Sequence, residues 1–179
     1  MKNIVLKYGL ISGLILTVLC AIHWPVMINQ HLPEPWGMVV GFSTMILAFT
    51  AVFFGIRAYR DKQGGELTFG RGLQVGLLIA LITCAFYVIG WEIVYWNFIP
   101  DFADRYAAMT ISRMQADGAS AAEIAKTRAE MAQFKEMYAN PIYNTAVTFM
   151  EIFPVGLIIS VLSAAILRRK SGPAVAATA

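Results

Sequence analysis

The sequence predicts an all-α integral membrane protein, with four transmembrane helices in a bundle and an extracytoplasmic helical hairpin between the third and fourth helices. Four long apolar stretches carry this prediction, because each is near or above the ~20 residues that a helix needs to cross the hydrocarbon core. Charged residues make up only 14% of the chain, against about 25% in an ordinary soluble domain, and they gather between the stretches. The predicted spans cover residues 4–28, 37–57, 71–99 and 141–167. Residues 1–170 then form one membrane domain, and an Ala-rich disordered tail follows at 171–179.

Prolines are expected to mark the ends of several spans. Pro25 is expected to end or kink the first span, and Pro33 and Pro35 to keep the short loop after it non-helical. Asn140 before Pro141 has the pattern of an N-cap followed by proline at the first helical position. The fourth span is therefore expected to begin at this pair.

Lysine and arginine predict the orientation. With four spans both termini lie on one side, and nine basic residues fall there, whereas five on the long segment of the other side are offset by six acids. By the positive-inside rule both termini are cytoplasmic. The tryptophans agree, because all four fall towards the span ends that this topology places outside: Trp24, Trp36, Trp91 and Trp96. The net charge of +3 is then a topology signal, and no nucleic-acid partner is expected.

The long outer segment is predicted to form two short helices, over about 101–116 and 121–139. Asp117-Gly118 is a turn signal, and Ser120 with Glu123 three residues later fits a capping box. Apolar residues recur at near-helical spacing on both helices: Phe102, Tyr106, Met109, Ile124, Met131, Phe134 and Tyr138. We expect this hairpin to cover the outer mouth of the bundle or the lipid headgroups. A docking surface for a protein partner is the alternative.

Small residues repeat at four-residue spacing within the spans. Such pairs let two helices approach closely. They occur at Gly9/Gly13, Gly37/Gly41 and Gly72/Gly76, and more weakly at Ser160/Ala164. A homo-oligomer is compatible with these pairs but is not favoured, because a four-span protein uses most such faces for its own packing.

Several motifs carry a resemblance to a known family. They are Gly55-Ile56-Arg57-Ala58-Tyr59-Arg60-Asp61, Gly64-Gly65, Thr68-Phe69-Gly70, Gly76, Ile99-Pro100-Asp101-Phe102, Met150-Glu151-Ile152-Phe153-Pro154-Val155-Gly156 and Leu167-Arg168-Arg169. In these segments the chain resembles the bacterial membrane proteins grouped as domain of unknown function 4199. The resemblance implies four spans in a bacterial cytoplasmic (inner) membrane. That family has no assigned activity, so the resemblance implies no catalytic residues.

Two acids inside apolar sequence are the main candidates for a site. A carboxylate near the middle of a bilayer costs on the order of 2.5–3.5 kcal/mol, so Glu92 and Glu151 should each find a partner, face the bundle interior or stay protonated. Tyr95 shares a helix face with Glu92, and His23 lies in the outer part of the first span. One hypothesis is that these residues form a polar pocket for a proton, a cation or the polar part of a lipid-like ligand. The alternative is that each acid is a structural link between helices and that His23 only faces headgroups.

No motif points to catalysis, a metal or a cofactor. Cys20 and Cys84 lie within spans and form no C-x-x-C pair, so we expect free thiols. Membrane lipids are the expected surroundings, and Arg57, Arg60 and Arg71 are candidates for contact with their headgroups, although these charges are also the topology signal.

Two classes of function remain. The first is a non-enzymatic accessory, scaffold or membrane-embedded binding protein, which the small size and the absence of motifs favour. The alternative is a small transporter or a ligand- or ion-binding bundle that uses Glu92 and Glu151. The lack of an evident inverted repeat weighs against transport.

Overall fold

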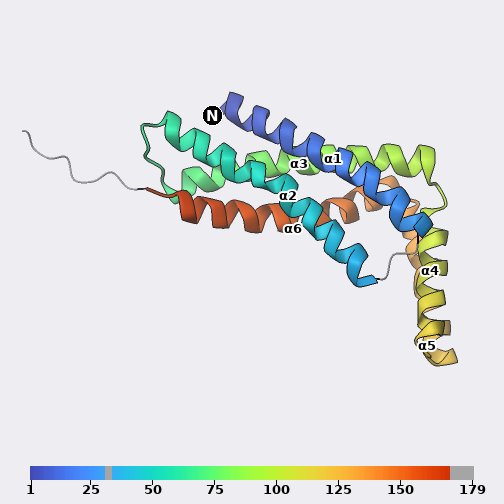
Figure 1. Cartoon of the computed structure of the whole chain (residues 1–179). Coiled ribbons are helices and arrows are strands. Elements are labelled where there is room, and N and C mark those ends of the chain that lie inside the picture. The colour runs from blue at the N-terminus through green and yellow to red at the C-terminus, as the bar shows by residue number, and fades with distance from the viewer. Residues whose placement is uncertain (31–33, 170–179) are drawn as a thin grey trace, which may run out of the picture. The chain divides into compact units, whose positions relative to one another are not determined.

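The computed structural model describes residues 1–30 and 34–169, except for the side chains of residues 23–30, 34 and 35 (Figure 1). These residues form six helices: α1 (Lys2–Gln30), α2 (Glu34–Lys62), α3 (Phe69–Phe98), α4 (Phe102–Ala116), α5 (Ala121–Tyr138) and α6 (Pro141–Leu167). Four of them, α1, α2, α3 and α6, are long and apolar enough to cross a membrane. The predicted helical class with four apolar spans is therefore confirmed. The predicted tail at 171–179 lies outside the described residues.

Pro25 and Pro35 both lie inside helices, and only the loop predicted at Pro35 is wrong. α1 continues through Pro25 to Gln30, so this proline does not end the helix. Proline is tolerated inside membrane-spanning helices because other groups satisfy the carbonyl that it leaves free. α2 begins at Glu34, so Pro35 lies in its first turn rather than in a loop. The N–H groups of a first turn have no partner within the helix, and proline therefore loses nothing there. Pro33 lies outside the described residues.

The chain divides into two compact units. Unit 1 consists of Met1–Tyr87 together with the residues from Glu151 onwards, and unit 2 consists of Val88–Met150. Unit 1 thus holds α1, α2, the first part of α3 and the second part of α6. Unit 2 holds the end of α3, both short helices and the beginning of α6.

In unit 1, two glycines of α1 allow close contact with α3. A Cβ atom built at Gly9 would lie 2.8 Å from the Cβ of Ile82, and one built at Gly13 would lie 2.7 Å from the Cβ of Phe86. Ser12 lies between the two glycines, and its hydroxyl donates to the carbonyl of Ala48 on α2 at 2.8 Å. The first predicted small-residue pair is therefore used for packing inside the chain.

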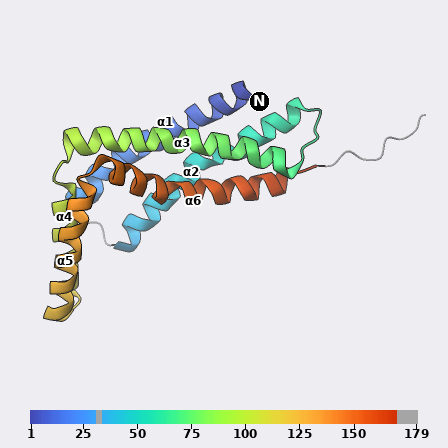
Figure 2. The same ribbon diagram turned by 180° about the vertical axis from the view of Figure 1, so that it is seen from behind.

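The contact of α3 with α6 joins two further predicted pairs. A Cβ atom at Gly72 would lie 3.2 Å from the Cβ of Ala164, and one at Gly76 would lie 3.0 Å from the Cβ of Ser160. The start of α3 and the end of α6 meet in Figures 1 and 2. Gly41 differs, because no described atom lies within 4 Å of a Cβ built there. The fully buried large side chains of unit 1 are Leu16, Phe49, Val52, Ile56, Val75, Ile79 and Ile152.

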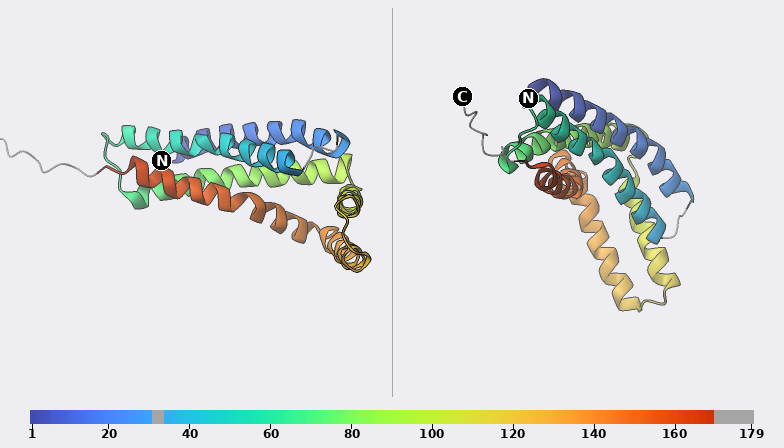
Figure 3. Two further views of the ribbon diagram at one scale, coloured as in Figure 1. Left: turned by 60° about the horizontal axis from the view of Figure 1, so that its bottom comes forward. Right: turned by 60° about the vertical axis from the view of Figure 1, so that its left-hand side comes forward.

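In unit 2, α4 and α5 match the predicted helices to within about a residue at each end. The turn between them contains Gly118, whose φ of +75° lies in the left-handed region that favours glycine. Ser120 accepts from the N–H of Glu123 at 3.3 Å, and the carboxylate of Glu123 accepts from the N–H of Ser120 at 2.8 Å. The predicted capping box is therefore present. Figure 3 shows the two helices side by side on either side of the turn.

The start of α6 also follows the prediction. Asn140 Oδ1 accepts from the backbone N–H of Ile142 at 2.9 Å and from that of Tyr143 at 3.4 Å. Pro141 occupies the first helical position, where a missing N–H costs nothing. The cap and the proline together fix the first residue of this span.

Acidification is expected to open the first turn of α5. The hydroxyl and the backbone N–H of Ser120 hold the pKa of Glu123 below its ordinary value of 4.5. Ionised Glu123 therefore stabilises the folded state fully above pH 4.5, and this contribution is lost as the pH falls from there through the folded pKa. Amide hydrogen exchange, corrected for intrinsic rates, should show less protection of this turn at about pH 3 than at neutral pH.

The control for this prediction is Glu123→Gln. Glutamine can complete a capping box but does not titrate. In this variant, the amides in the first turn of α5 should be equally protected at both pH values. Equal protection of the wild-type turn at the two pH values would contradict the proposed role of the Glu123 carboxylate.

Candidate functional site

Glu92 lies near the end of α3, in unit 2, and both of its carboxylate oxygens accept hydrogen bonds. Trp96 Nε1 donates to Oε2 at 2.7 Å, and Thr145 Oγ1 donates to Oε1 at 2.8 Å. Hydrogen bonds to a carboxylate are shorter and stronger than those between neutral groups. The Glu92 side chain is half-buried and links α3 to the beginning of α6.

Tyr95 lies beside Glu92 on the same helix and is buried among aromatic rings. Its ring centroid is 4.9 Å from that of Trp96 and 5.4 Å from that of Tyr138, both in edge-to-face geometry. Edge-to-face pairs of this kind stabilise a fold beyond the area that they bury. The structure thus brings Tyr95 and Glu92 together, with Trp96 in contact with both.

A buried hydrogen-bond network joins three helices next to these residues. Trp91 Nε1 on α3 donates to Tyr138 Oη on α5 and to Asn144 Oδ1 on α6, each at 2.9 Å. Asn144 is fully buried, and its Nδ2 lies 3.5 Å from the carbonyl oxygen of Tyr138. Thr148 Oγ1 donates to Asn144 Oδ1 at 3.3 Å. Because buried polar groups are costly when unpaired, this network fixes the relative placement of the three helix ends.

The apolar faces of α4 and α5 meet each other and the end of α3. We call the rings that meet there the aromatic cluster: Trp91, Tyr95, Trp96, Phe102, Tyr106, Phe134 and Tyr138. Centroid distances of 5.1 Å for Trp91 with Phe102 and 4.9 Å for Phe134 with Tyr138 are typical of packed rings. Lys135 Nζ of α5 also lies 2.6 Å from Asp104 Oδ1 of α4. The two short helices are therefore held to each other by an ion pair as well as by packing, and the rings hold them to the end of α3.

Glu151 lies in unit 1, on α6. Its side chain is exposed, and within the described residues it forms no hydrogen bond or ion pair. It follows Pro141 by ten residues, which is roughly 15 Å along a helix. A carboxyl group at such a place is expensive in lipid and is a candidate for function.

The proposed convergence of the polar residues stays a prediction. Glu92 and Tyr95 belong to unit 2, whereas Glu151 belongs to unit 1. The side chain of His23 lies outside the described part of the structure. In the described residues, no group of three His, Cys, Asp or Glu side chains could hold a metal ion. Cys20 and Cys84 form no disulfide there.

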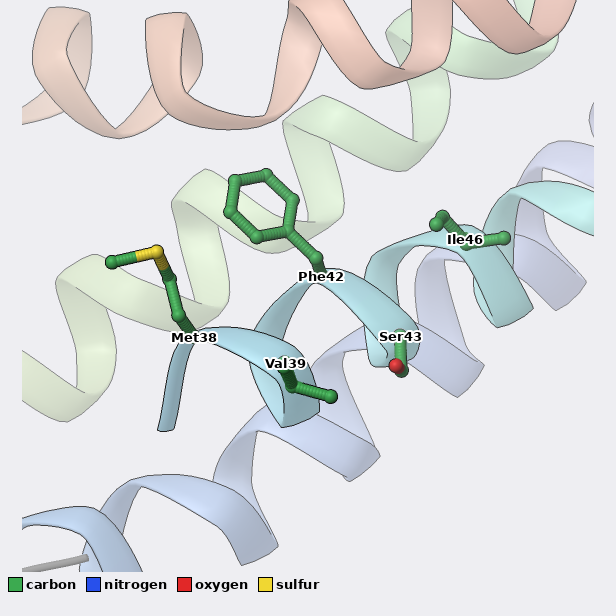
Figure 4. A pocket seen from close by; sticks show the side chains of 5 residues that line it. All are labelled: Met38, Val39, Phe42, Ser43 and Ile46. Atoms are coloured by element: carbon green, nitrogen blue, oxygen red, sulfur yellow. The ribbon is translucent and has the colours of Figure 1, made fainter. Parts of the chain in front are cut away.

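A shallow hollow on α2 is apolar. It has a volume of about 460 Å³ and is lined by Met38, Val39, Phe42, Ser43 and Ile46 (Figure 4). Its volume lies within the range of ligand pockets, which is roughly 300–1,000 Å³. However, all five side chains come from one helix, so the hollow is an open depression in an apolar surface and offers a single hydroxyl. It is unsuited to a charged ligand.

The three arginines predicted to contact lipid headgroups differ in their surroundings. Arg60 donates to Asp61 Oδ1 from Nε at 3.1 Å and from Nη2 at 2.9 Å, and Arg57 Nε lies 3.9 Å from Asp61 Oδ2. Arg71 Nη1 instead donates to the neutral side chain of Gln74 at 3.1 Å. Asp61 therefore forms ion pairs with both arginines near the end of α2, whereas Arg71 at the start of α3 forms none among the described residues.

Comparison with known proteins gives one family and no individual relative. The family described as Protein of unknown function (DUF4199) matches residues 7–169. No curated protein and no solved structure matches the chain. The match includes most of α1 and the whole of the other five helices.

Proposed function

Because the chain belongs to the DUF4199 family of proteins of unknown function, we propose its function from the geometry of its own residues. We propose a non-catalytic accessory or scaffold protein of the bacterial cytoplasmic membrane. Its four spans form a bundle with both termini in the cytoplasm. Its α4 and α5 form an extracytoplasmic hairpin that binds a protein partner.

The aromatic cluster is the observation that carries this proposal. It uses the apolar faces of α4 and α5 within unit 2, and the network around Trp91 ties α5 to α3 and α6. A binding surface that is already ordered loses little conformational freedom when a partner binds. Charged residues and alanines make up most of the exposed positions of the two helices. An ordered helical pair with charged residues on its outer face is suited to protein recognition.

The environment of Glu92 favours this function over transport. Both oxygens of its carboxylate are engaged, by Trp96 and by Thr145. A carboxylate that carries a proton or an ion through a cycle must exchange such partners, whereas a structural link keeps them. The short distances of 2.7 and 2.8 Å therefore support a structural role for Glu92.

The proposal is tested by exchanging a charge pair on the outer face of α5. Lys126 and Glu130 are exposed and 3.8 Å apart, one helical turn from each other. The variant Lys126→Glu/Glu130→Lys keeps the net charge and an i,i+4 pair, so the helix should remain stable. Native mass spectrometry of protein extracted with its membrane into lipid nanodiscs should show a second protein bound to wild type and lost in the variant. A wild-type protein without a partner, or a partner indifferent to the exchange, would contradict the proposal.

Glu151 favours a second candidate function, a bundle that binds an ion or a lipid-like ligand. Its carboxyl is exposed on an apolar helix and has no partner among the described residues. In the same mass spectra, a small molecule bound to wild type and lost in Glu151→Gln would support this function. Under the accessory function, Glu151→Gln keeps the protein partner and loses no small ligand. Glu92→Gln is the matched control, because it alters an acid whose oxygens are already engaged.

A further inference from the structure

Two backbone hydrogen bonds place an arginine beside the start of α3, in unit 1. The N–H of Leu67 donates to the carbonyl of Arg169 at 3.0 Å, and the N–H of Arg169 donates to the carbonyl of Leu67 at 2.9 Å. The residue before Arg169 is also an arginine. This single bridge therefore holds the end of the last span, with its two cations, against the segment that leads into α3.

The packing of α3 on α6 brings a third arginine to the same end. Arg71 precedes Gly72, whose Cβ position lies 3.2 Å from the Cβ of Ala164. Arg168 follows Ala164 by one helical turn, and its N–H donates to the carbonyl of Ala164 at 3.1 Å. The three residues, Arg71, Arg168 and Arg169, are called the arginine cluster below. Backbone contacts, rather than contacts of the arginine side chains, hold the cluster in place.

The positive charge of the arginine cluster is not compensated. All three side chains are exposed, and within the described residues none forms an ion pair. Arg71 has only the neutral Gln74 as a hydrogen-bond acceptor. Glu66, which precedes Leu67, is exposed and likewise forms no ion pair among the described residues. One acid near three cations leaves an excess of positive charge, and no ion pair holds these guanidinium groups as Asp61 holds those of Arg57 and Arg60.

Exposed apolar side chains lie at the same two helix ends as the arginine cluster. Phe69 and Ile166 are 39% and 71% exposed, in the first turn of α3 and the last turn of α6. Both helices are long and apolar enough to cross a membrane, so a ligand at these ends that combines an anion with a hydrocarbon chain fits better than a soluble anion. Guanidinium groups bind phosphate oxygens in bidentate fashion. We propose that the arginine cluster binds the phosphate of an anionic phospholipid whose acyl chains lie along the apolar ends of α3 and α6.

The test uses the full chain in nanodiscs made of equal parts of phosphatidylglycerol and phosphatidylcholine. Native mass spectrometry of protein released from them should show phosphatidylglycerol retained in preference to phosphatidylcholine. The variant Arg71→Gln/Arg168→Gln/Arg169→Gln should lose this preference. At low salt, the ratio of retained phosphatidylglycerol to phosphatidylcholine should fall roughly fivefold for each arginine replaced. The control Arg57→Gln/Arg60→Gln removes two charges near the end of α2 that are ion-paired with Asp61. It should retain the preference.

Each other outcome overturns the proposal. Equal retention in wild type and in the triple variant would show that the cluster binds no lipid, and an equal loss in the control would show a response to charge alone. Displacement of phosphatidylglycerol by excess inorganic phosphate would show a site for a soluble anion. If the triple variant fails to fold, the single changes Arg71→Gln and Arg168→Gln should each lower retention roughly fivefold. This site is independent of the proposed accessory function, so either can fail without the other.

Discussion

Replacing Trp91 with alanine is expected to lower the free energy of unfolding by about 3–5 kcal/mol, the range for removing a large buried aromatic side chain. Trp91 is 4% exposed, and its ring packs on Tyr95 and Phe102. The change also removes the N–H that donates to Tyr138 and to the buried Asn144. Equilibrium unfolding in mixed micelles, followed by far-ultraviolet circular dichroism, measures the loss without relying on tryptophan fluorescence.

Two further variants separate the contributions of Trp91. Trp91→Phe keeps a ring but removes the N–H, and should cost about 1–3 kcal/mol, the penalty for losing a buried hydrogen-bond partner. Trp36→Ala is the control, because this side chain is 63% exposed on α2. It should change the unfolding free energy much less. If Trp91→Ala and Trp36→Ala had equal effects, Trp91 would not be a central member of unit 2.

The double variant Gly9→Val/Gly13→Val is expected to force α1 away from α3. A Cβ at either position would lie under 3.0 Å from side-chain atoms of Ile82 or Phe86 that are close to the backbone and cannot rotate away. Overpacking of this kind costs about 1–3 kcal/mol at each site. The hydroxyl of Thr17, which lies 3.4 Å from the carbonyl oxygen of Phe86, should lose its bond as the helices separate. The same unfolding measurement in mixed micelles gives the loss of stability.

Gly41→Val is the matched control for the glycine pair. It makes the same substitution in an apolar helix where no described atom lies within 4 Å of the added Cβ. Its unfolding free energy should stay close to that of wild type, because only the local preference of the helix changes. A double variant at positions 9 and 13 that is as stable as Gly41→Val would contradict the close approach of α1 to α3.

Features that depend on nearby residues could be predicted from the sequence. The turn at Gly118, the capping box of Ser120 and Glu123 and the cap at Asn140 all use partners within a few residues, so spacing alone identifies them. The four apolar helices follow from composition over about 20 residues. Pro35 shows the limit of this reasoning, because proline ends a helix in its interior but fits its first turn.

Features that depend on distant residues could not be predicted in the same way. The small-residue pairs could be recognised in the sequence, but their partner helices could not, because a periodic pattern does not identify the helix that it packs against. The structure shows that Gly72 and Gly76 pack against Ala164 and Ser160. Trp91 was expected at the membrane boundary, whereas its N–H donates to residues 47 and 53 positions away. A signal for this network was present in Asn144, a polar residue in an apolar span that must find a partner. The choice of Trp91 as that partner required the structure.

The bridge between Leu67 and Arg169 also bears on how the chain is made. It joins the connection before the third span to a residue that is synthesised about a hundred positions later. During translation the backbone groups of Leu67 therefore lack this partner until Arg169 has left the ribosome. The pair can form only after the whole of α6 has been synthesised.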